Sequence, residues 1–140
     1  KPMYFKNMFN GATSFNRPVD GWTWPSTLGG SRDYENMFKG ATSFNRDVAP
    51  LDYRNLDDAN TSLKNMLEDS AFDKANYFQL LKALATNQYH NDLGGTTFGN
   101  VSNAFNAPCK YGATAETHRN TLLDPVGAFQ WSSIIDQGKI

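Results

Sequence analysis

An eleven-residue phrase occurs twice in the chain, and it constrains the fold more than any other feature of the sequence. NMFNGATSFNR covers residues 7–17 and NMFKGATSFNR covers residues 36–46, so only Asn10 and Lys39 differ. A degenerate third copy begins 29 residues after the second, at 65–67 (Asn-Met-Leu). A 29-residue unit is too small to bury its own apolar side chains, so such units are stable only when each covers its neighbour. We therefore predict a solenoid of stacked repeats.

Matched positions in successive repeats become columns of side chains in the interior of such a stack. Met8 is expected inside with them, next to Phe9 in the phrase. In the third repeat, Ala71-Phe72 falls one residue short of the step, which indicates a turn that has lost a residue. The predicted columns are Phe9, Phe38 and Leu67; Phe15, Phe44 and Phe72; Phe5, Tyr34 and Leu63; and Val19 and Val48.

The local pattern within each repeat predicts a strand followed by a tight turn. Phe5, Asn7 and Phe9 alternate, which favours a short strand that ends at each Asn-Met-Phe. Gly11 and Gly40 then permit a turn with positive φ. The recurring asparagines predict amide ladders that hydrogen-bond the turn backbone, at Asn7, Asn36 and Asn65 and at Asn16 and Asn45.

Near-identity of the two phrases favours a structural role, because a stack needs the same side chain at every level. A functional role stays open for the Asn-Arg pairs that close the phrase, so Arg17 and Arg46 are candidate ligand contacts. The stretch between the repeats is less regular and holds two of the three tryptophans. Trp22 is expected to be buried, whereas an exposed Trp24 with its counterpart Tyr53 would form an aromatic strip suited to carbohydrate or protein contact. The alternative is that Trp24 and Tyr53 pack over the sheet edge.

The pattern Met-Phe-x-Gly-Ala-x-x-Phe-Asn, followed by a branched aliphatic residue and Trp, resembles the BspA-like surface-protein repeat. Residues 7–22 and 36–51 carry this resemblance. That repeat is a leucine-rich-repeat-like module of about 25 residues, found in many bacterial surface proteins and mycoplasma lipoproteins. The chain departs from it in its longer step, in Leu51 at the second Trp position and in the degraded third repeat. The resemblance implies surface display, adhesion and host interaction, and no catalysis.

The second half of the chain predicts a cap over the last repeat. Tyr77, Leu80, Leu81 and Leu84 form an apolar helical stripe after Asp73 as N-cap, and a second helix is expected from Thr114, as N-cap, to Leu123. The segment 129–135 predicts a final strand, paired with the segment near 96–98. The resemblance extends here, because the family continues with an apolar helix, a helix carrying Arg (Arg119) and a Trp strand that ends in an acidic residue and Gly (131–138). We predict an α+β chain: a short-strand, leucine-rich-repeat-like solenoid of about two and a half repeats at 1–72, incomplete at its N-terminal side, and an α/β C-terminal cap at 73–140, packed as one unit.

Composition narrows the function classes. The net charge is -1 with an isoelectric point near 6.1, so nucleic acid and anionic membranes are not expected partners. No apolar run is long enough to cross a bilayer. Cys109 is the single cysteine, and neither it nor His90 and His118 have zinc-site spacing, so no metal and no cofactor is expected. A Cys109–His118 thiol catalyst with an Asn or Asp is conceivable, and calcium binding at Asp57-Asp58 or Glu68-Asp69 stays open.

These observations predict a non-enzymatic extracellular or cell-surface module that binds a protein or glycan through the solenoid face and the loops between repeats, chiefly 23–30 and 52–58. The rival prediction is a structural subunit of an extracellular filament, sheath or virion fibre that contacts copies of itself. An enzyme is a distant third.

Overall fold

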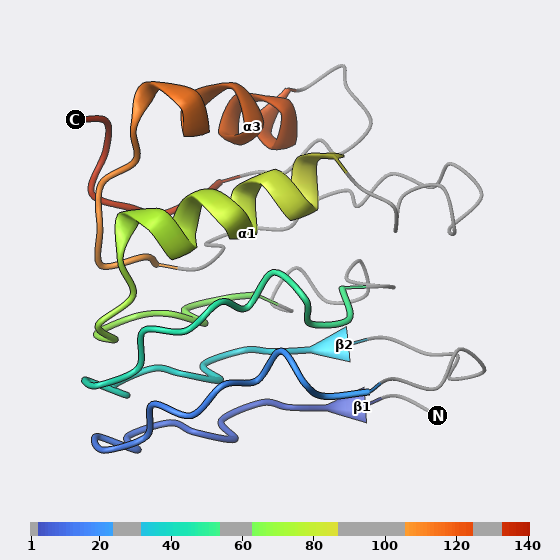
Figure 1. Cartoon of the computed structure of the whole chain (residues 1–140), viewed down its shortest axis with the longest axis vertical. Coiled ribbons are helices and arrows are strands. Elements are labelled where there is room, and N and C mark those ends of the chain that lie inside the picture. The colour runs from blue at the N-terminus through green and yellow to red at the C-terminus, as the bar shows by residue number, and fades with distance from the viewer. Residues whose placement is uncertain (1–2, 24–31, 54–62, 87–105, 125–132) are drawn as a thin grey trace.

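A computed structural model describes residues 3–23, 32–53, 63–86, 106–124 and 133–140 of the chain. Its regular elements are the strands β1 (Met3–Tyr4) and β2 (Arg32–Asp33) and the helices α1 (Lys74–Thr86) and α3 (Ala113–Leu123). Figure 1 shows three levels of irregular backbone stacked on one another, with α1 over the third level and α3 over α1. We call residues 3–23, 32–53 and 63–73 the first, second and third levels.

Hydrogen bonds join the levels in a register of one repeat. β1 and β2 pair in parallel, Met3 opposite Arg32 and Tyr4 opposite Asp33. Beyond the strands, every second N–H of the first level donates to a second-level carbonyl: Asn7 to Glu35 at 3.0 Å, Phe9 to Met37 at 2.9 Å and Gly11 to Lys39 at 2.7 Å. The second level donates to the third in the same way: Asn36 to Lys64, Phe38 to Met66 and Gly40 to Glu68.

The predicted strand through Asn-Met-Phe is wrong, because the strands end earlier and a series of tight turns follows. The N–H of Met8 donates to the carbonyl of Phe5, that of Asn10 to Asn7 and that of Ala12 to Phe9, each at 3.1 Å. The cause is the asparagine at the head of the phrase, which has positive φ at all three levels: 60° at Asn7, 55° at Asn36 and 54° at Asn65. Asparagine tolerates this left-handed conformation better than most residues, and it turns the chain out of the strand.

Two further expectations concern the same turns. The predicted positive φ of the glycines is confirmed, with 73° at Gly11 and 70° at Gly40, and Asp69 adopts 56° at the matching third-level position. The amide ladder predicted at the head of the phrase does not form between the described residues. Asn7 Oδ1 accepts from Asn10 on its own level, and the buried Asn36 Oδ1 has no hydrogen-bond partner. These asparagines act through their backbone conformation.

Four phenylalanine rings form a block at the centre of the first two levels. Within a level, the ring centroids lie 3.9 Å apart for Phe9 and Phe15 and 3.8 Å apart for Phe38 and Phe44. Between levels, Phe9 stacks on Phe38 at 5.5 Å and Phe15 on Phe44 at 5.8 Å. Stacked aromatic pairs contribute about 0.5–1.5 kcal/mol beyond their buried area. The other columns also lie in the core: Phe5, Tyr34, Leu63, Val19, Val48, Leu67 and Phe72 are all buried.

The interior position predicted for Met8 is wrong. Met8 is 48% exposed, whereas Met37 and Met66 at the same repeat position are 0% exposed. Phe9, Phe15 and Trp22 are only partly buried, so the expected burial of Trp22 is incomplete. The reason is geometric: the second and third levels have a level below them, and the first level has none among the described residues.

The first helix has the predicted N-cap and stripe. Asp73 Oδ1 accepts the N–H of Asn76 at 2.9 Å, and α1 buries Tyr77, Leu80, Leu81 and Leu84. These four residues belong to the same apolar cluster as the levels, so one core runs through the described parts of both halves.

The remaining expectations for the second half need correction. α3 is capped by Gly112 rather than Thr114, and Gly112 has no side chain to make a capping bond. α3 buries Ala115 and Leu122, and it packs on α1. Of the strand predicted at 129–135 the structure describes 133–135, where Ile134 forms a single bridge and no longer strand. The described end of the chain runs in parallel beside 107–111, where Ala107 donates to Ile135 at 2.8 Å and Ile140 to Tyr111 at 3.0 Å. The expected partner segment 96–98 and residues 129–132 lie outside the described residues.

Candidate functional site

Three polar side chains at matched repeat positions link the levels along one edge. Asn16 Oδ1 accepts the N–H of Asn45 at 3.0 Å, and Asn45 Oδ1 accepts the N–H of Asp73 at 3.0 Å. The predicted Asn16–Asn45 ladder is therefore present, and Asp73 continues it because the third repeat is one residue shorter. Asp73 is also the N-cap of α1, so the residue that ends the ladder begins the first helix.

Arg17 and Arg46 follow this ladder, and the structure brings both to the same exposed edge. Arg46 Nε donates to the carbonyl of Asn16 at 2.9 Å and to its Oδ1 at 3.2 Å. This contact fixes the guanidinium of Arg46 while its two terminal nitrogens have no hydrogen bond from the described residues. Lys74 occupies the next position and is also exposed. We call Arg17, Arg46 and Lys74 the cationic edge.

A shallow hollow of about 190 Å³ lies beside the cationic edge and is lined by Pro18, Asp20, Arg46 and Asp47. The hollow therefore combines one fixed guanidinium with two carboxylates. Farther along the ladder, the pKa of Asp73 is lowered by the hydrogen bonds from the Asn45 side chain and the Asn76 N–H. The cationic edge and the hollow together present guanidinium, ammonium and carboxylate groups.

Tyr53 is not available as a binding residue. It is 0% exposed, its ring centroid lies 5.6 Å from that of Tyr34, and its hydroxyl donates to the carbonyl of Val48 at 2.6 Å. The exposed aromatic strip predicted with Trp24 is therefore wrong at Tyr53, because the Tyr53 ring packs against Tyr34 and its hydroxyl is bonded to Val48 inside the core. Trp24 and the stretch 24–31 lie outside the described residues.

The start of the predicted second loop, at Asp52, is structural as well. Asp52 Oδ2 accepts from Arg32 Nε at 3.0 Å and from Nη2 at 2.8 Å, with both side chains almost fully buried. Its carbonyl accepts from the hydroxyl of Tyr34 at 2.6 Å. A buried guanidinium and carboxylate satisfy each other here, and sequence reasoning missed this pair because Met3 and Thr23 occupy the matching positions in the first repeat.

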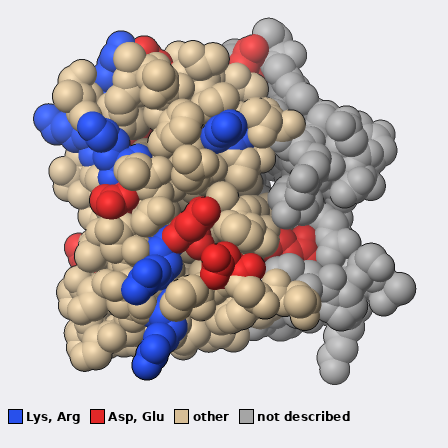
Figure 2. Space-filling view, viewed as in Figure 1, with Lys and Arg blue, Asp and Glu red and all other residues tan. Residues whose placement is uncertain are grey.

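Charged side chains of opposite sign lie side by side over the levels, as Figure 2 shows. Lys6 pairs with Glu35 at 2.6 Å and Lys39 with Glu68 at 2.5 Å, each one repeat apart. These hydrogen bonds raise the pKa of both lysines. The sequence contains a signal for the Lys39–Glu68 pair. Asn10, Lys39 and Glu68 occupy the same repeat position, which is the single position where the first two phrases differ.

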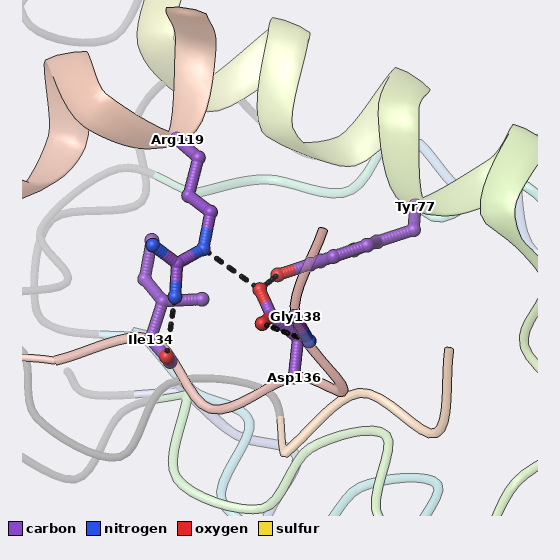
Figure 3. Close-up of polar contacts among 5 residues, drawn as sticks. All are labelled: Tyr77, Arg119, Ile134, Asp136 and Gly138. Carbon is purple, nitrogen blue, oxygen red and sulfur yellow. Dashed lines mark hydrogen bonds and ion pairs between the residues drawn. The ribbon is translucent and has the colours of Figure 1, made fainter. Parts of the chain in front are cut away.

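A second polar cluster ties the end of the chain to the helices (Figure 3). Asp136 Oδ2 accepts from Tyr77 Oη and from Arg119 Nε, each at 2.8 Å, and Asp136 Oδ1 accepts the N–H of Gly138 at 3.1 Å. Arg119 also donates to the carbonyl of Ile134 at 3.1 Å. All these groups have partners within the cluster, so it serves as a clasp. It gives a physical reason for the spacing of Arg119, Asp136 and Gly138.

The clasp controls the protonation of its members. Burial raises the pKa of Tyr77, and the adjacent Asp136 raises it further, so the hydroxyl remains a donor. Burial lowers the pKa of Arg119, but the hydrogen bond and the charge of Asp136 outweigh it and the net shift is upward. The guanidinium also lies 4.9 Å from the ring centroid of Tyr111, a cation–π distance.

Cys109 lies near the clasp in an environment that disfavours the thiolate. Burial, then the charge of Asp136, raises the pKa of Cys109 to about 11. A cysteine nucleophile needs the opposite shift. His118 contacts Phe78, with ring centroids 5.8 Å apart. His90 lies outside the described residues.

Among the residues described, no group of three or more His, Cys, Asp or Glu side chains is arranged to hold a metal ion. Of the two acidic pairs considered for calcium, Asp57-Asp58 lies outside the described residues. In the other, Glu68 is paired with Lys39 and Asp69 has the left-handed conformation. Neither described helix, α1 or α3, has the length and apolarity needed to cross a membrane.

Comparison with known proteins adds a family and nothing more specific. No curated protein and no solved structure matches the chain. One family model, described as "Mycoplasma protein of unknown function, DUF285", matches residues 2–79, which span the three levels and the first part of α1. Because this match covers more than half of the 140 residues, the chain belongs to the DUF285 family.

Proposed function

We propose that the chain is a non-enzymatic recognition module of the BspA-like type, in which a leucine-rich-repeat-like solenoid presents a binding edge. The DUF285 match and the repeated register of backbone hydrogen bonds support this reading. The observation that carries the recognition role is the cationic edge. Three basic side chains at successive repeat positions are exposed, and one of them, Arg46, is held in place by Asn16.

The ligand chemistry follows from the guanidinium groups. Arginine binds carboxylate, sulfate and phosphate groups through a planar pair of N–H donors, and a fixed arginine loses less entropy on binding. The matched partner is an anionic group on a protein or glycan of another surface. As for the resembled family, we place the module at the cell surface or outside the cell. Labelling intact cells of the source with an impermeant amine reagent tests that placement.

Binding to an array of sulfated and carboxylated glycans, and to a panel of surface proteins, tests the recognition role. The Arg17→Gln/Arg46→Gln variant should lose binding, and binding by the parent should weaken as salt rises. The matched control is Lys6→Gln/Lys39→Gln, which removes the same charge at positions already paired with glutamate. Equal loss in both variants would mean that net charge, not the cationic edge, drives binding. A parallel Trp24→Ala variant tests the stretch between the first two repeats.

A structural subunit is the second candidate, and the exposed apolar side chains of the first level favour it. Met8 is 48% exposed, beside the partly buried Phe9, Phe15 and Trp22. Contacts between copies would cover such a surface. Sedimentation of the purified chain over a range of concentrations tests this role, and a monomer throughout that range counts against it.

A further inference from the structure

The hollow beside the cationic edge holds groups of opposite charge that do not pair with one another. It lies between two levels and encloses about 190 Å³, with Pro18 and Asp20 from the first level and Arg46 and Asp47 from the second. The ion pairs among the described residues join Arg46 to neither Asp20 nor Asp47. The hollow therefore offers hydrogen-bond donors and acceptors to a ligand within one small space.

Two of these side chains are held in place before any ligand binds. Arg46 Nε donates to the carbonyl of Asn16 at 2.9 Å, and the terminal nitrogens of Arg46 make no hydrogen bond to the described residues. Asp47 Oδ1 accepts the N–H of Ala49 at 2.9 Å, and no described residue donates to Asp47 Oδ2. Such preorganisation lowers the entropy cost of binding.

The combination of groups selects a ligand that both donates and accepts hydrogen bonds. A guanidinium only donates, and an ionised carboxylate only accepts. A sulfate or phosphate group suits Arg46, but the carboxylates of Asp20 and Asp47 repel it. Adjacent hydroxyl groups satisfy both sides, because their oxygens accept from Arg46 and their protons are donated to the two carboxylates.

We propose that this hollow binds one neutral sugar unit of a glycan through two adjacent hydroxyl groups, with Pro18 against the apolar face of the sugar ring. A single unit suits the volume, which is below the roughly 300–1,000 Å³ of sites for drug-sized ligands. This inference goes beyond the proposed function, which concerns an anionic group at the cationic edge, because it requires no charge on the ligand.

An array of neutral glycans built from glucose, mannose and galactose tests the proposal with the full chain. The parent should bind at least one of them, and this binding should be insensitive to salt because the ligand has no charge to screen. Periodate cleavage between adjacent hydroxyl-bearing carbons, followed by borohydride reduction, should abolish the binding. The proposal is overturned if no neutral glycan binds, or if the periodate-treated array binds equally.

The diagnostic variant is Asp47→Asn, which keeps the Oδ1 acceptor for the Ala49 N–H but replaces the charged Oδ2 with an amide donor. It should weaken neutral-glycan binding by about tenfold or more, because hydrogen bonds to ionised groups are the stronger ones. The matched control is Asp33→Asn, since Asp33 Oδ1 accepts the N–H of Glu35 in the same way at 2.9 Å. The control should bind like the parent, and an equal loss in both variants would place the binding elsewhere.

The same variants separate this inference from the proposed function. Asp47→Asn should preserve or strengthen salt-sensitive binding to sulfated glycans, because it removes a carboxylate that repels them. If sulfated glycans bind and neutral ones do not, the cationic edge keeps its proposed role and the sugar site in the hollow is overturned. If neutral glycans bind and sulfated or carboxylated ligands do not, the sugar site stands and the anionic ligand is overturned.

Discussion

The first two levels carry almost the same phrase but have different environments. Met8 is 48% exposed and Met37 is 0% exposed, although the residues on either side of them match in sequence. The second level lies between two neighbours, whereas the first has a described neighbour on one side only. Burial in this molecule is therefore set by position in the stack and not by the phrase.

The backbone behaves in the opposite way, because it is nearly the same in both levels. φ is 60° at Asn7 and 55° at Asn36, and 73° at Gly11 and 70° at Gly40. Turn geometry follows from local residue type, and side-chain burial follows from neighbours. Substitutions at matched positions can separate these two contributions.

The largest contrast is expected at Asp52, whose counterpart in the first level is the exposed Thr23. Asp52→Ala leaves Arg32 charged and buried without this carboxylate, and such losses cost about 3–5 kcal/mol. Thr23→Ala should change stability by less than about 0.5 kcal/mol, as surface substitutions usually do. Urea denaturation of both variants measures the difference. A similar small cost for both would mean that water reaches Arg32.

The second contrast is between the two methionines. Met37→Ala removes a fully buried side chain and should lower the free energy of unfolding by about 2–5 kcal/mol. Met8→Ala should cost less than about 0.5 kcal/mol, because the Met8 side chain is 48% exposed. The same denaturation measurement applies, and equal losses would show that Met8 is covered in solution.

Gly11 and Gly40 should respond alike to substitution, because their backbone conformation is the same in both levels. Gly11→Ala and Gly40→Ala each place a side chain in the left-handed conformation, at about 1–2 kcal/mol. A Cβ at Gly40 would lie 3.6 Å from Gly11, an ordinary contact, and one at Gly11 would meet nothing within 4 Å. Thermal unfolding should give matching losses. A much larger loss at Gly40 would indicate that packing between levels, rather than φ, dominates there.

The smallest expected effect is the pH dependence of the stability that Asp73 contributes at the end of the Asn16–Asn45 ladder. The pKa of Asp73 is lowered in the folded chain by the Asn45 side chain and the Asn76 N–H. Its contribution is therefore present above the ordinary carboxyl pKa of about 4 and is lost as pH falls through the lower folded value. Asp73→Asn keeps the cap, so its stability should trail the parent at neutral pH and converge with it in acid.

The control for that profile is the Asp73→Asn substitution made in an Asn45→Ala background, which lacks the side-chain donor that lowers the pKa of Asp73. In that background the effect of Asp73→Asn should depend less on pH. An Asp73→Asn difference that stayed flat in the parent background would mean that the lowered pKa does not contribute to stability.

Several parts of the fold could be predicted because their signals are local. The stripe from Tyr77 to Leu84 and the cap at Asp73 lie within one stretch of sequence. The Asn16–Asn45 ladder followed from the repeat step. The ligand contacts predicted at Arg17 and Arg46 stay a prediction, and both side chains are exposed.

Other parts could not be predicted because they join residues that no periodicity relates. Arg32 meets Asp52 across 20 positions and Arg119 meets Asp136 across 17, and only folding brings them together. Tyr53 looked like a surface aromatic because its counterpart Trp24 follows an irregular stretch. Its burial comes from packing against Tyr34 and from its hydrogen bond to Val48, which no repeat position signals.

The sequence by itself determined the step of 29 residues, the columns that stack and the left-handed turns at glycine, because residue type limits φ and repetition aligns like with like. Only the tertiary structure decided which side chains of each column are buried and which charged residues pair in the core. Those outcomes depend on what lies next to each level, and identical phrases cannot encode different neighbours.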